Sequence, residues 1–131
     1  MIKVGITGSI ASGKTTASKI ISKNKGPLFS ADKVVKKLYT SKNFKKTVSI
    51  KLNIQQNTNF KKAIKIRISK SDKFLSRLGK IIHPLVRKQM YIFTKKNKNK
   101  KFIFFEIPLL VENKLYKYFD TIILIKSKKS L

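Results

Sequence analysis

The chain switches between two hydrophobic patterns. Short, mostly apolar runs occupy residues 2–7, 28–30, 102–105 and 121–125. Runs of this length, apolar on both faces of an extended chain, are typical of buried strands in parallel sheets. We expect the four runs to form one sheet.

The other apolar residues recur every three or four positions, as on the buried face of a helix. One helix is expected over 15–24, a second after the strand at 28–30, and a block of helices over 41–96. The stripes in this block are Phe44-Val48-Leu52, Phe60-Ala63-Ile64-Ile68, Phe74-Leu75-Leu78-Ile81-Ile82 and Val86-Met90-Phe93. We expect Pro84 to begin a new helix, because proline suits the first helical position.

Strands that alternate with helices predict an α/β fold with a parallel sheet between helical layers. The 131 residues, 41% of them hydrophobic, suit a single domain, with 41–96 as a helical insertion on one side of the sheet.

No apolar run is long enough to span a bilayer. Without cysteine the chain has no disulfide and no thiolate metal site. We expect a cytoplasmic enzyme with no membrane partner.

The charge is strongly basic, with 32 Lys and Arg residues against five acidic residues and a net charge of +27. Such an excess attracts polyanions, which makes nucleic-acid binding one interpretation. The other is a solvated basic surface. The lysines are spread over nearly every segment and are not interleaved with aromatic residues as a base-stacking platform requires. We favour the second interpretation and expect no nucleic-acid partner, although a basic surface would help to capture a phosphate-rich substrate.

A phosphate-binding pattern follows the first expected strand. The sequence Gly8-Ser9-Ile10-Ala11-Ser12-Gly13-Lys14-Thr15 matches G-x-x-x-x-G-K-[ST], the P-loop. Its glycines let backbone N–H groups converge on phosphate oxygens, and the next helix adds the positive end of its dipole. Lys14 reaches the β- and γ-phosphates, and the Thr15 hydroxyl ligates Mg²⁺. The residues predicted to bind ATP are Gly8, Ala11, Ser12, Gly13, Lys14, Thr15 and Thr16.

Four further residues are candidates for the site. Asp32 stands where an expected strand ends and a helix begins, the edge of a parallel sheet where ligands bind, although it could be only a helix N-cap. Glu106 ends an apolar run, as in the Walker B pattern that holds Mg²⁺ directly or through water. His83, the one histidine, and Arg87 lie one turn apart. Arg87 could pair with a phosphate or lie on the surface, and a lone histidine is more often structural.

With these residues in hand, the sequence resembles the dephospho-coenzyme A kinases, P-loop kinases similar to the nucleoside monophosphate kinases. Four stretches carry the resemblance in the family's order along residues 1–131. They are the loop at 6–16, Ala31-Asp32, Ile82-His83-Pro84-Leu85-Val86-Arg87 and Ile107-Pro108-Leu109-Leu110-Val111-Glu112-Asn113-Lys114-Leu115-Tyr116. The last two are more specific than the loop, which many families share. Ser30 replaces the first acid of the family's Asp-Ala-Asp motif.

The resemblance implies a three-layer P-loop fold with strand order 2-3-1-4, in which the helical insertion binds the CoA substrate. It implies transfer of the γ-phosphoryl group of ATP to the ribose 3′-hydroxyl of dephospho-CoA. Asp32 would orient or deprotonate that hydroxyl, and Lys14 would stabilise the developing charge. Thr15 would hold Mg²⁺, with Glu106 where many members have aspartate. His83 and Arg87 would lie near the CoA phosphates.

Family members continue past the position that matches Leu131, with an arginine-bearing lid helix and a last strand. We therefore expect these 131 residues to be truncated at the C-terminus, and we do not expect full activity from them alone, because the lid excludes water and stabilises charge in the transition state. Two alternatives stay open at this point. One is another P-loop small-molecule kinase, of the monophosphate or shikimate type. The other is a non-catalytic basic protein that keeps a nucleotide or nucleic-acid site.

Overall fold

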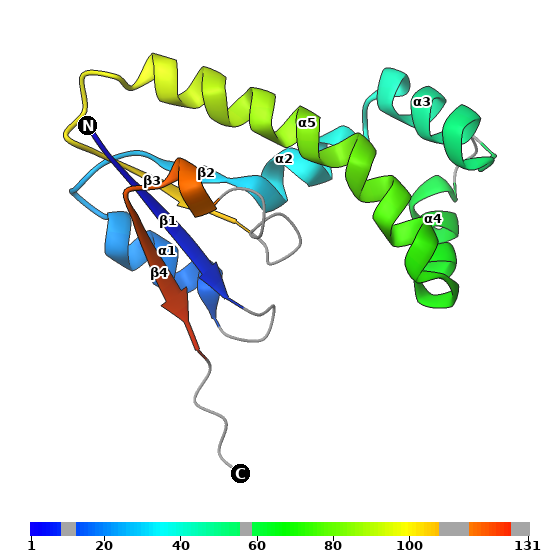
Figure 1. The fold of residues 1–131 in the computed structure, drawn as a ribbon, viewed down its shortest axis with the longest axis horizontal. Helices are drawn as coiled ribbons and strands as arrows, with labels where there is room; N and C mark the ends of the chain where they lie inside the picture. The colour runs from blue at the N-terminus through cyan, green and yellow to red at the C-terminus, as the bar shows by residue number, and fades with distance from the viewer. Residues whose placement is uncertain (9–12, 56–58, 108–115, 127–131) are drawn as a thin grey trace, which may run out of the picture. The chain divides into compact units, whose positions relative to one another are not determined.

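The computed structural model describes residues 1–8, 13–55, 59–107 and 116–126. Figure 1 shows the order of the elements. They are β1 (Ile2–Gly8), α1 (Lys14–Ser22), β2 (Leu28–Ser30), α2 (Ala31–Leu38), α3 (Lys42–Leu52), α4 (Phe60–Lys70), α5 (Asp72–Lys96), β3 (Phe102–Glu106), the 3₁₀ helix η2 (Tyr116–Tyr118) and β4 (Thr121–Ile125). Among the helices described, none is long and apolar enough to cross a membrane.

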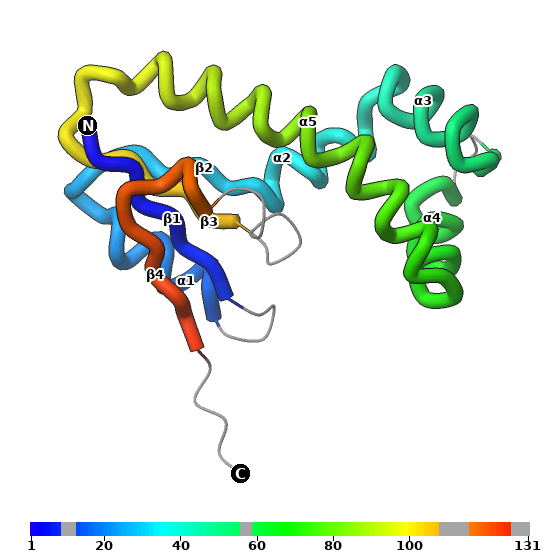
Figure 2. Tube along the Cα trace, viewed as in Figure 1, coloured from blue at the N-terminus to red at the C-terminus, as the bar shows by residue number. Residues whose placement is uncertain are grey.

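The chain divides into two compact units. The sheet unit is Met1–Asp32 with Lys88–Leu131, and the helical unit is Lys33–Arg87. The chain enters the helical unit within α2 and leaves it within α5, as the tube in Figure 2 traces. Both connections between the units are therefore helical.

The four strands form one parallel sheet in the order β2-β3-β1-β4, which confirms the predicted fold class and strand order. The register sets Ser30 beside Glu106 and Glu106 beside Ile6. The carboxyl ends of β2, β3 and β1 therefore meet at one edge of the sheet. In open α/β sheets this edge is where ligands bind.

Helices cover both faces of the sheet and make the predicted three layers. On one face, Ile21 of α1 packs against a core of Val4, Ile6 and Phe104. The other face carries a cluster of aromatic rings at centroid distances of 5.3 to 5.8 Å. Its members are Phe29, Phe93 from the end of α5, Phe105, Tyr118 and Phe119. Alternate residues of a strand face opposite sides of the sheet, so the central strands β1 and β3 are apolar at nearly every position. The expectation of a buried strand is wrong for β4, an edge strand in the described sheet, in which Ile122 and Leu124 are exposed.

Gly26, between α1 and β2, lies against the backbone of β3. A Cβ atom at this position would stand 2.1 Å from the carbonyl oxygen of Phe102. Because backbone cannot rotate away as a side chain can, we expect Gly26→Ala to lower the free energy of unfolding by about 3 kcal/mol. Urea denaturation would measure the change. Lys25→Ala, on the exposed neighbouring residue, is the control, and equal stability of the two variants would contradict the prediction.

The helical unit has an apolar core of its own. The predicted stripes of α3 and α4 are buried at Phe44, Val48, Leu52, Phe60 and Ile64, and those of α5 at Phe74, Leu78, Ile82 and Val86. The ring of Tyr39 packs on Phe44 and Phe60, and burial raises the pKa of its phenol. Serine hydroxyls cap two helices, Ser41 accepting from Phe44 N at 3.3 Å and Ser71 from Phe74 N at 3.1 Å.

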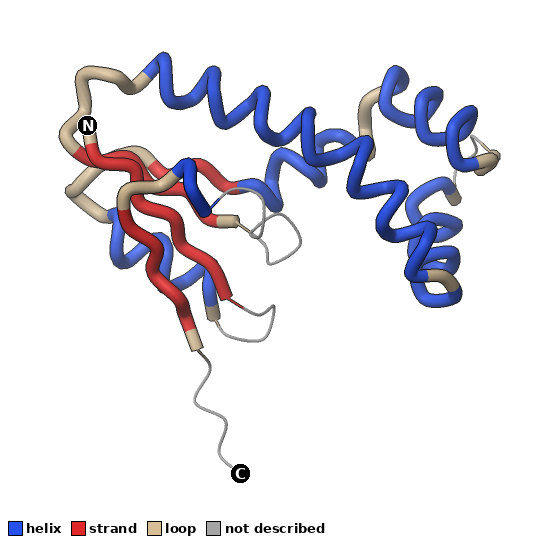
Figure 3. The backbone as a smooth tube through the Cα atoms, viewed as in Figure 1, coloured by secondary structure: helices blue, strands red, loops and turns tan. Residues whose placement is uncertain are grey.

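The prediction of a new helix at Pro84 is wrong. α5 runs unbroken from Asp72 to Lys96 with Pro84 inside it, as the continuous helix in Figure 3 shows. Proline removes the hydrogen bond that residue 84 would donate to the carbonyl of Lys80. The buried side chains continue at four-residue spacing across this point, at Leu78, Ile82, Val86 and Met90. Packing along this stripe offsets the cost of one lost bond.

Candidate functional site

The predicted phosphate loop joins β1 to α1 in the sheet unit. β1 ends at Gly8, and Gly13 stands immediately before α1 with a φ of +75°. This left-handed conformation costs glycine little but strains residues that carry a Cβ atom. The structure therefore explains why glycine occupies position 13. The predicted contacts at Ala11 and Ser12 lie outside the described residues, and Thr16 lies exposed in the first turn of α1.

Lys14, the first residue of α1, has a buried side chain, only 5% exposed. Its Nζ atom donates to the carbonyl oxygen of Ile107 at 3.4 Å. That carbonyl is held in place because Ile107 N donates to Ile6 O at 2.9 Å, one step past the β1–β3 ladder. In the described part of the chain, Lys14 forms no ion pair with a carboxylate. Its ammonium group is thus available to an anion at the end of β1.

Thr15 and Glu106 meet at the same edge of the sheet. The Thr15 hydroxyl donates to Oε2 of Glu106 at 3.0 Å, joining residues that are 91 positions apart in the sequence. Glu106 ends β3 and is only 2% exposed. A buried carboxylate needs a polar partner or a cation, and the hydroxyl supplies only one hydrogen bond. The hydroxyl of the loop and the acid of the Walker B pattern therefore lie in direct contact.

These two groups fit a magnesium ion better than most other metals. Among the residues that the structure describes, no three His, Cys, Asp or Glu side chains gather as a metal site. Mg²⁺ differs from zinc in that it needs no such cluster, since it keeps several waters and takes one or two protein oxygens together with substrate phosphates. Thr15 and Glu106 carry oxygen atoms of the kind that Mg²⁺ takes.

Asp32 lies on the sheet unit's side of the boundary, in the first turn of α2 and half-buried. Because Asp32 is the second residue of that helix, it does not occupy the N-cap position, which precedes the first helical residue. It follows Ser30, which pairs with Glu106. The sheet thus brings Asp32 to the same carboxyl edge as Glu106 and the end of β1.

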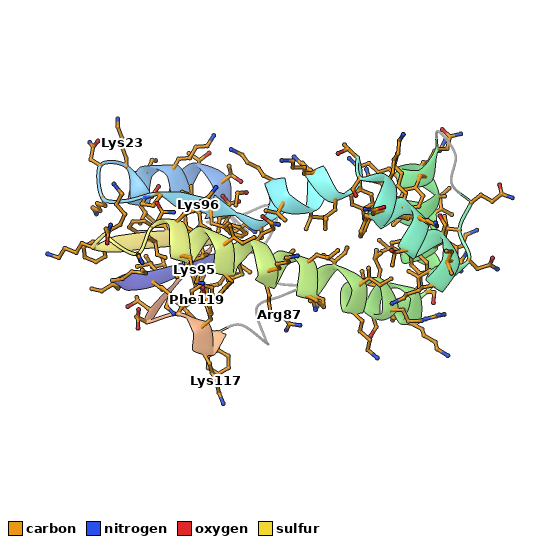
Figure 4. The ribbon with its side chains drawn as sticks, turned by 90° about the horizontal axis from the view of Figure 1, so that it is seen from above. Lys23, Arg87, Lys95, Lys96, Lys117 and Phe119 are labelled. Carbon is orange, nitrogen blue, oxygen red and sulfur yellow. The ribbon has the colours of Figure 1, made fainter. Side chains whose placement is uncertain are left out.

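His83 and Arg87 belong to the helical unit, on α5. His83 is half-buried, and its ring lies over Gly79, where an added Cβ atom would meet Cε1 at 3.3 Å. Arg87 is exposed, and its side chain extends away from the helix in Figure 4. The predicted roles of both residues in substrate binding stay predictions. In the stretch at 107–116, which also carries the family resemblance, residues 108–115 lie outside the described residues.

One contact in the site has no signal in the sequence. The partner of Lys14 is a backbone carbonyl, which every residue carries, so nothing marks Ile107 for this purpose. Only the register of β1 against β3 brings that carbonyl to the lysine. The contact between Thr15 and Glu106, in contrast, follows from two patterns that both predict magnesium ligands.

Comparison with known proteins decides the family. The family model described as dephospho-CoA kinase matches residues 2–131. The chain belongs to the dephospho-CoA kinase family. It is 34% identical over 131 residues to the dephospho-CoA kinase of Rickettsia conorii, covering 100% of this chain and 68% of that protein. It is 38% identical over 129 residues to the enzyme of Bartonella quintana, covering 95% of this chain and 66% of that protein.

A solved structure supports the same fold. TT1252 from Thermus thermophilus superposes with a TM-score of 0.70 at 23% identity, covering 95% of this chain and 65% of that one. At this identity the likeness speaks for the fold alone. This chain spans about two thirds of the length of the dephospho-CoA kinases that it matches. The family and fold expected from the sequence are therefore confirmed.

Proposed function

We propose that this protein transfers the γ-phosphoryl group of ATP to the ribose 3′-hydroxyl of dephospho-CoA, which yields CoA and ADP in the last step of coenzyme A biosynthesis. Membership of the dephospho-CoA kinase family supports the proposal. The observation that carries it is the contact of Thr15 with Glu106 at 3.0 Å beside the buried ammonium of Lys14. A hydroxyl, a carboxylate and a lysine at the end of a central strand suit a magnesium-bound triphosphate.

Each group has a proposed part in holding ATP. Lys14 would leave the Ile107 carbonyl for the β- and γ-phosphate oxygens, whose negative charge is a stronger partner than a neutral carbonyl. Thr15 and Glu106 would hold Mg²⁺, which neutralises charge on the phosphates when bound. Gly13 and the start of α1 would add backbone N–H groups.

On the acceptor, we assign Asp32 as the residue that takes the proton of the reacting hydroxyl. Oxygen O3′ would attack the γ-phosphorus, the bond to the β–γ bridging oxygen would break, and ADP would leave. The proton of the hydroxyl would pass to the Asp32 carboxylate. Its position after β2, at the same sheet edge as Glu106, supports this role. His83, Arg87 and the helical unit would bind the phosphates and remainder of dephospho-CoA. The cytoplasmic location expected from the sequence belongs to the same proposal.

The test is ADP formation from ATP by the 131-residue chain, with and without dephospho-CoA and Mg²⁺. We expect ADP release that requires both, and a product that carries phosphate on the 3′-oxygen. Shikimate and nucleoside monophosphates, offered as competing acceptors, test the other kinase class. Turnover with one of them but not with dephospho-CoA would replace the proposed acceptor. A folded chain that binds ATP but turns over none of them would sink the proposed activity.

Replacing Glu106 tests the magnesium ligands. In Glu106→Gln the side-chain carbonyl can still accept from the Thr15 hydroxyl, but the negative charge is lost. We expect the Mg²⁺-dependent part of ATP affinity to fall about 10- to 100-fold in calorimetric titrations. Asp72→Asn, which removes an exposed carboxylate from the first turn of α5, is the matched control. Unchanged Mg²⁺ dependence in Glu106→Gln would exclude this residue as a ligand.

A further inference from the structure

The helical unit contains a groove that none of the proposed kinase residues lines. It has a volume of about 350 Å³ and lies between α3 and α5. We call it the α3–α5 groove. Its walls include Phe44, Thr47, Lys51, Lys80, Ile81 and Leu85. All lining residues fall within Lys33–Arg87, so one compact unit builds the groove. Its volume is that of pockets that hold small molecules.

The groove has a fixed apolar wall. Phe44 is 4% exposed and packed against the ring of Tyr39, and Ile81 and Leu85 are half-buried on α5. The Arg77 guanidinium donates to the carbonyl of Lys51 at 2.9 Å, which ties α5 to the end of α3. The two sides of the groove are therefore held together by packing and by a hydrogen bond. Such a wall suits the apolar body of a ligand.

The charged side chains that line the groove are all positive. Lys51 and Lys80 line it, and no carboxylate does. Residues 33–87 contain 16 Lys and Arg residues and one acid, Asp72. In the described part of the chain neither lysine forms an ion pair. Two ammonium groups beside an apolar wall, without a carboxylate to neutralise them, favour a negatively charged ligand.

We propose that the α3–α5 groove binds a small organic anion with an apolar body. The body would lie against Phe44 and Ile81, and the anionic group would pair with Lys51 and Lys80. None of the residues named for the kinase reaction lines the groove, so the site rests on its own lining. It lies in the unit that we propose to bind dephospho-CoA, so an assignment to that acceptor rests on the proposed function.

The probe is 8-anilinonaphthalene-1-sulfonate, which joins aromatic rings and an N–H group to an anion and fluoresces when shielded from water. The neutral analogue N-phenyl-1-naphthylamine lacks the sulfonate and serves as its pair. In the double variant Lys51→Gln/Lys80→Gln we expect about tenfold weaker binding of the anion and unchanged binding of the analogue. The control is Lys61→Gln/Lys62→Gln, which removes two exposed charges from α4 of the same unit.

Equal losses in the two double variants would show general attraction to a basic surface and would overturn the proposal. Ile81→Trp and Thr47→Trp each fill the groove from a different helix, and both should abolish binding of the probe. Full binding in either one, with an unchanged circular dichroism spectrum, would also overturn it. Added dephospho-CoA then separates two sources of the ligand. If dephospho-CoA displaces the probe, part of dephospho-CoA occupies the groove. If it does not, the ligand of the groove is a separate anion.

Discussion

Lys14→Ala is expected to lower the rate of ADP formation with dephospho-CoA by about 10²- to 10³-fold. The lysine ammonium is buried beside the end of β1, where a charge interacts with phosphate oxygens more strongly than it would in water. Alanine leaves the helix intact and removes the one cation that we assign to the β- and γ-phosphates. Steady-state kinetics at saturating ATP and acceptor would measure the loss in kcat.

Lys19→Ala is the matched control for Lys14, because it removes the same residue type from an exposed position of the same helix. The control should keep kcat within a factor of two, since it only reduces a large surface charge. A loss of similar size in both variants would show that net charge, and not the position of Lys14, governs the rate. Full activity of Lys14→Ala would remove the lysine from the mechanism.

Asp32→Asn is expected to lower kcat about 10²- to 10⁴-fold, because the amide cannot take the proton of the acceptor hydroxyl. Asparagine has nearly the same shape and is tolerated in the first turn of α2, so the fold should be kept. Because we assign Asp32 to the acceptor and not to ATP, ATP affinity measured by calorimetry should not change. The combination of lost turnover with retained ATP binding would separate Asp32 from the residues of the phosphate loop.

Asp72→Asn is the control for this variant as well. Asp72 lies exposed in the first turn of α5, so its replacement removes the same charge from an equivalent place in a helix. We expect turnover within a factor of two of the unsubstituted chain. If Asp32→Asn behaved in the same way, Asp32 would be only a favourable charge near a helix N-terminus, and another group would have to receive the proton.

Lysines of the sheet unit extend from several different elements. Lys23, after α1, and Lys117, in η2, project outward from different elements in Figure 4. Lys95 lies over the ring of Tyr91 at 5.0 Å, and Lys3 lies over the ring of Tyr118 at 4.2 Å. These contacts hold single lysines against single rings. The interpretation of a solvated basic surface without a nucleic-acid partner stays a prediction.

Much of the sheet was predictable because its strands are locally distinctive. The predicted strands at 28–30 and 121–125 match β2 and β4, and the others differ by one residue at one end. The central strands β1 and β3 are covered on both faces and must be apolar at nearly every position, a requirement that shows in a single sequence. β4 has the same apolar pattern although it is largely exposed, so the pattern predicted this strand but not its burial. The prediction that a new helix begins at Pro84 was wrong for the opposite reason. Proline disfavours a helix interior through local geometry, whereas the buried stripe stabilises a continuous α5 only when the helix packs against its neighbours.

For this protein the sequence alone determined the phosphate loop, the acid at the end of β3 and the family, because each depends on residues close together in the chain. The tertiary structure decided which of them touch. Thr15 meets Glu106, and Lys14 meets the carbonyl of Ile107, across more than 90 residues, because β1 and β3 pair in parallel with Ile6 beside Glu106. Strand register is set by packing on both faces of the sheet at once, and no local pattern records it.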